Sequence, residues 1–133
     1  MNKTIAFVIH HVDFIENLGI PYLSAVAKAR GWHVDLILYD KKTVDANFKR
    51  INPAIVAYSA MSADAAVYLK INSELKSRYR FTSIIGGPHP TYFPDVRFEE
   101  DIDFIFRGEG EPAFDEFLEK YENGGDLEAI LAV

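Results

Sequence analysis

Residues 4–38 read TIAFVIHHVDFIENLGIPYLSAVAKARGWHVDLIL, an apolar run, a helix-like segment and a second apolar run. The two runs, 4–9 and 33–38, have the length of strands and are rich in Ile, Val, Phe and Leu. The segment 18–30 between them has helix-forming composition, and Gly31 stands where a helix would end. This order predicts a βαβ unit, and therefore a parallel sheet.

The same alternation continues along the chain. Further strands are expected at 54–59, 82–87 and 103–108, with helices at 43–50, 62–79 and 111–122. We therefore predict an α/β, flavodoxin-like (Rossmann-like) three-layer sandwich around a five-stranded parallel sheet in the order 2-1-3-4-5. Residues 1–125 are expected to form the domain, and residues 126–133 to begin a linker to a further domain.

Composition excludes several classes of protein. With 133 residues, of which 49% are hydrophobic, the chain can bury the core of one globular domain. A net charge of −6 without a basic cluster argues against a nucleic-acid partner. No apolar run approaches the ~20 residues needed to span a membrane. The absence of cysteine excludes disulfides and thiolate-bound metal clusters within these residues and favours a cytoplasmic location.

Ligands of such sheets bind at the carboxyl ends of the strands, so the segments after each strand are the candidate sites. The first of these, 10–19, contains His10, His11, Asp13 and Glu16. Their spacing matches no compact metal-ligand pattern, and neighbouring histidines at a strand end face opposite ways. A polar loop is therefore favoured over a metal site. The segment also lacks the G-x-G-x-x-G of a dinucleotide site.

The segment after the third strand, 58–64, is rich in small residues that would let a flat ligand approach the backbone, although Ser62 as a helix N-cap explains the same pattern. A receiver domain would need an aspartate at this strand end, where Tyr58 and Ser59 stand instead. That substitution argues against phosphorelay.

The stretch SIIGGPHPTYFPD, residues 83–95, ends the fourth apolar run in two glycines. Gly86 and Gly87 can expose backbone N–H groups with no Cβ in the way, and the prolines around His89 stiffen the exit. Three functions fit such a corner: a phosphate cradle, a metal site or a simple turn. The absence of cysteines and of a ligand cluster argues against a metal site, and the lack of a Gly-rich loop opening directly into a helix argues against a phosphate cradle. A simple turn and a space cleared for a ligand at the strand tip remain open.

After the fifth strand, the residues RGEGEPAF (107–114) form a polar turn that enters a helix. Glu109 and Glu111 lie near the start of that helix, where its dipole favours carboxylates. Helix capping explains them without catalysis, since no nucleophile or partner base accompanies them.

Two stretches taken together resemble one known family. IIGGPHPTYFPD (84–95) and DFIFRGEGEPAFDEFLE (103–119) are similar to the cobalamin-binding domain at the N-terminus of class B radical S-adenosylmethionine enzymes, as is LGIPYLSAVAKARGWHVDLILYD (18–40). The resemblance implies a module that binds cobalamin and has no catalytic residue of its own. The methyl transfer or ring-forming chemistry would belong to a downstream radical barrel that carries an iron–sulfur cluster and S-adenosylmethionine.

The resemblance also implies where cobalamin would bind. Its nucleotide tail would enter the carboxyl edge of the sheet, with the corrin lying across the strand tips. The matching positions are Ser59 and Met61 beside the tail, Gly86 and Gly87 making room for its base, His89 and Pro90 near the tail or corrin rim, and Gly108, Glu109 and Gly110 in the turn after the fifth strand.

The chain departs from one pattern common in cobalamin proteins, Asp-x-His-x-x-Gly after the first strand. Counting from Asp13 puts Ile15 at the position of the histidine that ligates cobalt, so cobalamin is expected to bind without a histidine ligand from this chain. Two alternatives remain open. The same fold without cofactor would serve as a docking or substrate-gating domain, and a small stand-alone hydrolase or nucleotide-binding enzyme would use His89, Glu109 and Glu111.

Overall fold

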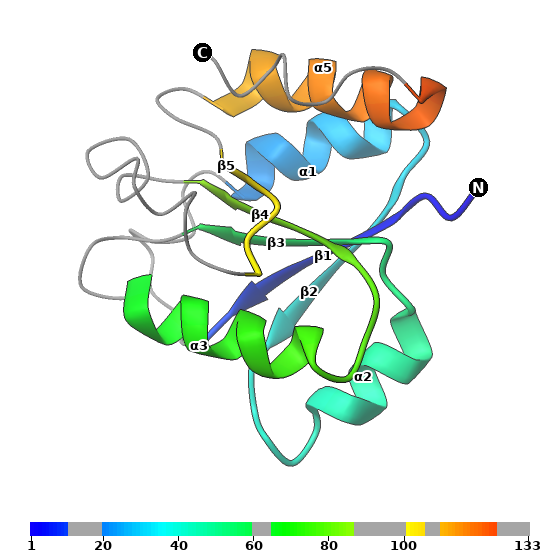
Figure 1. Ribbon diagram of the computed structural model, residues 1–133. Helices are drawn as coiled ribbons and strands as arrows, with labels where there is room; N and C mark the ends of the chain where they lie inside the picture. The colour runs from blue at the N-terminus through cyan, green and yellow to red at the C-terminus, as the bar shows by residue number, and fades with distance from the viewer. Residues whose placement is uncertain (11–19, 60–64, 87–100, 106–109, 125–133) are drawn as a thin grey trace.

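The computed structural model describes residues 1–10, 20–59, 65–86, 101–105 and 110–124. Its sheet is parallel throughout, with strands in the order β2-β1-β3-β4-β5 (Figure 1). The strands are β1 (Thr4–Ile9), β2 (His33–Leu38), β3 (Ile55–Ser59), β4 (Thr82–Gly86) and β5 (Phe104–Ile105). The predicted parallel α/β fold is confirmed, and the boundaries of the first four strands lie within one residue of those expected.

The fifth strand is where the expectation needs correction. The sheet has four strands of five or six residues, whereas the described residues of β5 are Phe104 and Ile105, and Asp103, expected to begin this strand, precedes it. Residues 106–108 lie outside the described part of the chain. At Asp103, where the expected strand would begin, a side-chain contact replaces part of the regular backbone pairing with β4. The Ser83 N–H of β4 donates to the Asp103 carboxylate at 2.8 Å, so a side chain takes the place of a backbone acceptor.

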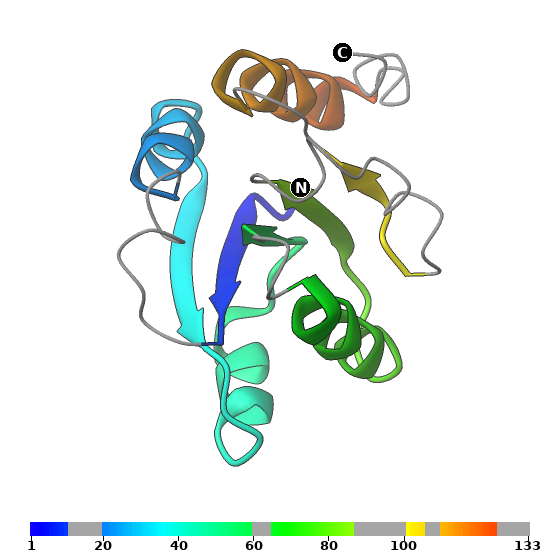
Figure 2. The same ribbon diagram turned by 90° about the vertical axis from the view of Figure 1, so that its left-hand side faces the viewer.

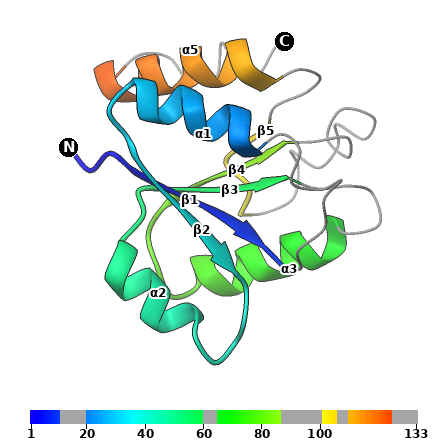
Figure 3. The ribbon, with the colours of Figure 1, turned by 180° about the vertical axis from the view of Figure 1, so that it is seen from behind.

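Helices cover both faces of the sheet. They are α1 (Ile20–Ala29), α2 (Val44–Ile51), α3 (Ala65–Lys76) and α5 (Gly110–Asn123). α1 and α5 lie side by side on one face, and α2 and α3 lie on the other (Figures 1 and 3). The view along the layers shows the sheet between the two pairs (Figure 2). The described residues therefore form the predicted three-layer sandwich, and none of their helices is long and apolar enough to cross a membrane.

Two apolar cores result, one on each face. The predicted helix faces fill them: Tyr68, Ile71 and Leu75 of α3 are buried on one side. Phe117 and the neighbouring apolar residues of α5 are buried on the other. Burial of this apolar surface supplies most of the free energy that favours folding.

The amino-terminal ends of the strands carry a polar cluster formed by Lys3, Arg30, Trp32 and Glu122, which we call the amino-edge cluster. Trp32 Nε1 donates to Glu122 Oε1 at 2.7 Å, and Arg30 Nη2 lies 3.1 Å from Glu122 Oε2. Lys3 Nζ lies 3.3 Å from Glu122 Oε1. The cluster joins the start of β1, the exit of α1 and the end of α5. Gly31, with φ of 83°, makes the expected left-handed turn after α1.

Glu122 should make folding stability depend on pH in the acid range. Burial alone would raise its pKa, but the hydrogen bonds from Trp32, Arg30 and Lys3 outweigh burial and hold the pKa below its usual value. A lowered folded-state pKa stabilises the protein above the unfolded-state pKa, and this stability is lost as the pH falls through the folded-state value. The melting temperature of the Glu122→Gln variant should therefore lie below that of the wild type at neutral pH and approach it in acid. A difference that grew in acid would contradict this assignment.

Candidate functional site

The carboxyl ends of the strands meet at one edge of the sheet, which we call the carboxyl edge. Ser59 ends β3 and Gly86 ends β4, and the two are partners in the strand register. One step back, Ile85 is the partner of Ile105, the last residue of β5. The structure therefore brings together two of the predicted site residues, Ser59 and Gly86, at neighbouring strand tips. Gly110, a third, begins α5.

The other predicted site residues are Met61, Gly87, His89, Pro90, Gly108 and Glu109, and they all lie outside the described residues. The same holds for the expected N-cap, Ser62. Their places at the site stay predictions. The described elements on either side of them, however, all end or begin at the carboxyl edge.

Helices add to the chemistry of this edge. Because α3 and α5 follow strands that end there, their amino-terminal ends at Ala65 and Gly110 both lie toward the carboxyl edge, on opposite faces of the sheet (Figure 1). A helix amino terminus presents unpaired N–H groups and a partial positive charge, which favour an anionic group such as a phosphate. The two helix amino termini therefore make the carboxyl edge favourable for an anionic group.

Three aromatic rings extend from this edge toward α3. His10 follows β1, and its ring centroid lies 5.0 Å from that of Tyr68 in an edge-to-face arrangement. The Tyr68 ring lies 5.7 Å from that of Tyr58. Among the described residues, no group of three or more His, Asp and Glu side chains is placed to hold a metal ion. His10, weighed above as a metal ligand, packs against an aromatic side chain of α3.

A buried polar network lies behind the rings, and we call it the Asn72 network (Tyr58, Asn72, Ser83 and Asp101). The Tyr58 hydroxyl donates to Asn72 Oδ1 at 2.9 Å, and Asn72 Nδ2 donates to the Asp101 carbonyl at 2.8 Å. Ser83 Oγ donates to the same carbonyl at 2.6 Å. Burial raises the pKa of Tyr58 well above its usual range, so its hydroxyl stays protonated and remains a donor.

Reasoning from the sequence missed the Asn72 network, although one signal was present. Asn72 stands four residues after Tyr68 and three before Leu75, in the middle of an apolar helix face. A carboxamide in such a position needs buried partners. Those partners are far away in sequence, at Tyr58 and Asp101, so the pattern alone could not name them.

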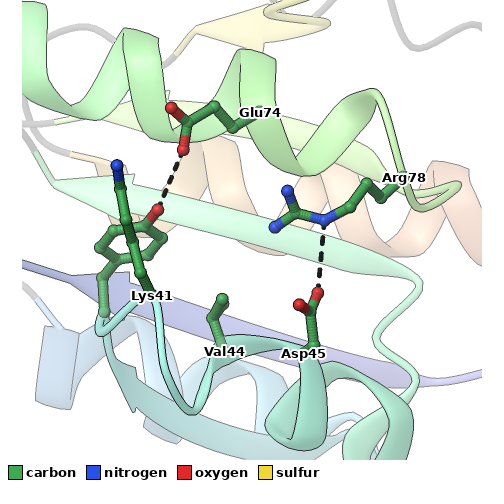
Figure 4. A pocket seen from close by; sticks show the side chains of 6 residues that line it. Lys41, Val44, Asp45, Glu74 and Arg78 are labelled. Atoms are coloured by element: carbon green, nitrogen blue, oxygen red, sulfur yellow. Dashed lines mark hydrogen bonds and ion pairs between the residues drawn. The ribbon is translucent and has the colours of Figure 1, made fainter.

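A separate hollow lies on the α2–α3 face, lined by Tyr39, Lys41, Val44, Asp45, Glu74 and Arg78 (Figure 4). The Tyr39 hydroxyl donates to Glu74 Oε2 at 3.0 Å, and Arg78 Nε lies 3.3 Å from Asp45 Oδ1. Basic and acidic groups line the hollow in equal number. Its contacts hold the segment that follows β2 against α3, and we assign it no ligand.

Comparison with known proteins shows to which family of domains the chain belongs. The fold and its carboxyl edge are those of a parallel α/β domain that binds a ligand at its strand tips. The family model of the B12 binding domain matches residues 6–118, so the chain belongs to this family. The resemblance to a cobalamin-binding domain is thereby confirmed, and cobalamin is supported as the ligand.

One curated relative is similar over most of the chain. It is an uncharacterized methyltransferase of Pyrococcus horikoshii, 29% identical in an alignment 128 residues long that covers 87% of this chain. The chain spans only 27% of the length of that relative. No solved structure was found to match.

Proposed function

We propose that this chain is the cobalamin-binding module of a larger methyltransferase-like protein. The observation that carries the proposal is the family match over residues 6–118, which extends from β1 into α5 and so includes the whole carboxyl edge. The small residues at that edge and the amino termini of α3 and α5 support it, because they suit the narrow, phosphate-bearing nucleotide tail of cobalamin.

The predicted site residues would contact different parts of cobalamin. Ser59 and Met61 would lie beside the nucleotide tail, and Gly86 and Gly87 after β4 would make room for its base. His89 and Pro90 lie near the tail or the corrin rim, and Gly108, Glu109 and Gly110 form the turn that leads into α5. Cobalamin supplies the cobalt–carbon chemistry when it is bound. With no Asp-x-His-x-x-Gly after β1, this chain supplies no histidine ligand to cobalt.

We further propose that the parent protein is a class B radical S-adenosylmethionine enzyme. The relative is named a methyltransferase and is much longer than the part that this chain matches, which leaves room for a catalytic barrel. The iron–sulfur cluster and S-adenosylmethionine would be bound by that barrel, since cluster ligands are cysteines and these 133 residues contain none. A cytoplasmic location is part of this proposal.

Gel filtration with cobalamin tests the central proposal. The purified chain is mixed with excess hydroxocobalamin or methylcobalamin, and the visible absorption of the corrin is followed in the protein peak. We expect the corrin bands to elute with the protein at about one cofactor per chain. The full-length parent protein is run in parallel, because a downstream domain would close over the corrin.

Each other outcome has a definite meaning. Protein free of corrin in both samples would contradict the proposal and favour the domain that keeps the fold, lacks the cofactor and serves in docking or gating. Hydrolytic turnover by the chain alone would favour the third interpretation, which rests on His89, Glu109 and Glu111. The family match lends that interpretation no support.

A further inference from the structure

The shortness of β5 raises the question of what holds it in the sheet. Its ladder consists of two register pairs, Ile84 with Phe104 and Ile85 with Ile105. Two pairs are few for an edge strand that contacts the sheet on one side only. Yet β5 comes shortly before Gly108, Glu109 and Gly110, which the proposed function places beside cobalamin. Its position must therefore be fixed by other contacts.

Side chains provide these contacts just before β5. The Asp101 carbonyl accepts hydrogen bonds from Asn72 Nδ2 at 2.8 Å and Ser83 Oγ at 2.6 Å. The Asp103 carboxylate accepts from the Ser83 N–H at 2.8 Å and lies 2.5 Å from Lys76 Nζ. Asp101 itself has a φ of 75°, a left-handed conformation that is uncommon outside glycine and needs such support. α3 and β4 together thus fix the entry to β5.

Asn72 is the centre of this arrangement. Its side chain is fully buried. Its Oδ1 accepts a hydrogen bond from the Tyr58 hydroxyl of β3, and its Nδ2 donates one to the Asp101 carbonyl. Asparagine is unfavourable within a helix, and a buried carboxamide is costly unless both of its ends are bonded. Leucine, of similar size, favours the helical conformation more strongly and has no buried polar group that needs a hydrogen-bond partner. The stability of α3 alone therefore does not explain asparagine at this position.

We propose that Asn72 is a positioning residue for cofactor binding. By joining Tyr58 to Asp101, it sets the spacing between β3 and β5, which lie on either side of β4 and its terminal Gly86. This inference rests on the proposed function, because the spacing matters for a ligand only if cobalamin binds at the carboxyl edge. Site geometry of this kind must hold to within about 0.5 Å for full affinity.

Two substitutions and their combination separate positioning from simple stabilisation. Asn72→Leu leaves the Tyr58 hydroxyl buried without its acceptor, and Tyr58→Phe leaves Asn72 Oδ1 without its donor, so each should lower the melting temperature. The double variant removes both polar groups, and it should melt above the Asn72→Leu variant. A residue with a purely structural role would regain affinity for cobalamin together with stability.

We expect affinity to behave differently from stability. Asn72→Leu should weaken hydroxocobalamin binding roughly tenfold, or about 1.4 kcal/mol, and the double variant should stay as weak despite its higher melting temperature. Tyr58→Phe alone should weaken binding to a similar extent, because it breaks the same bridge at its β3 end. Recovery of affinity in the double variant would overturn the inference.

A control and a second measurement complete the test. Trp32→Phe breaks a hydrogen bond in the amino-edge cluster, and it should lower the melting temperature without changing affinity. Amide hydrogen exchange without cofactor should show faster exchange at Phe104 and Ile105 in both Asn72→Leu variants, with β1 unchanged. Unchanged exchange at β5 would contradict the inference even where cobalamin binds. A wild type that binds no cobalamin, alone or in the full-length protein, would instead overturn the proposed function and this inference with it.

Discussion

Replacing Gly87 by valine is expected to abolish retention of cobalamin by the chain while leaving its melting temperature close to that of the wild type. The reason lies in the proposed site, where the double glycine makes room for the base at the end of the nucleotide tail. Gly86, the first of the pair, ends β4 beside Ser59 at the carboxyl edge. A branched side chain next to that position would occupy the space of the tail. Gel filtration with hydroxocobalamin measures retention, and thermal unfolding measures the fold.

Gly31 offers the matched control. It follows α1 at the opposite edge and has a φ of 83°, which side chains other than glycine adopt only with strain. Gly31→Val should cost about 1–2 kcal/mol of folding stability and leave cobalamin retention intact. The two substitutions should thus have opposite effects on binding and stability. Retention of corrin by the Gly87→Val variant would show that the tail enters elsewhere.

Replacing Phe117 by alanine is expected to cause the largest loss of stability. Phe117 is fully buried in α5, and its ring packs edge-to-face on Phe104 of β5 at 5.3 Å. Truncating a buried phenylalanine costs about 3–5 kcal/mol through lost burial and the cavity left behind. For a domain whose total stability is of the order of 5–15 kcal/mol, this is a large fraction. Urea unfolding followed by circular dichroism measures the change.

Tyr22 provides the comparison for that experiment. It is an aromatic residue of α1 with 64% of its surface exposed, and Tyr22→Ala should change stability by less than about 0.5 kcal/mol. If Phe117→Ala cost no more than Tyr22→Ala, the assignment of the α5 core would be wrong. Since Phe117 supports Phe104, the loss should also accelerate amide exchange at β5.

The body of the fold could be predicted because its signals are local. Apolar runs of strand length alternate with helical segments, and the ends of β1 and β2 match the expected residues. Gly31 marks the end of α1 in the sequence and in the structure alike. These features depend on neighbouring residues, so the pattern of one segment is enough to predict them.

β5 and the Asn72 network could not be predicted in the same way. The run 103–108 has the composition of a strand, but Asp103 turns its carboxylate back to the Ser83 N–H, a contact between segments twenty residues apart. Asn72 finds its partners on β3 and before β5. Such contacts arise only when the sheet and α3 are assembled. Of the candidate site, the sequence placed Ser59 and Gly86 at adjacent strand tips, whereas the family match was needed to support cobalamin as their ligand.

The ion pair between Lys3 and Glu122 brings together residues from the first and last elements of the described domain. With Lys3 Nζ only 3.3 Å from Glu122 Oε1, the start of β1 and the end of α5 are neighbours. Domains with adjacent ends tolerate insertion into other proteins and circular permutation. The described unit is therefore suited to insertion into a loop of another protein, with its carboxyl edge, the proposed site of cobalamin, facing away from the junction.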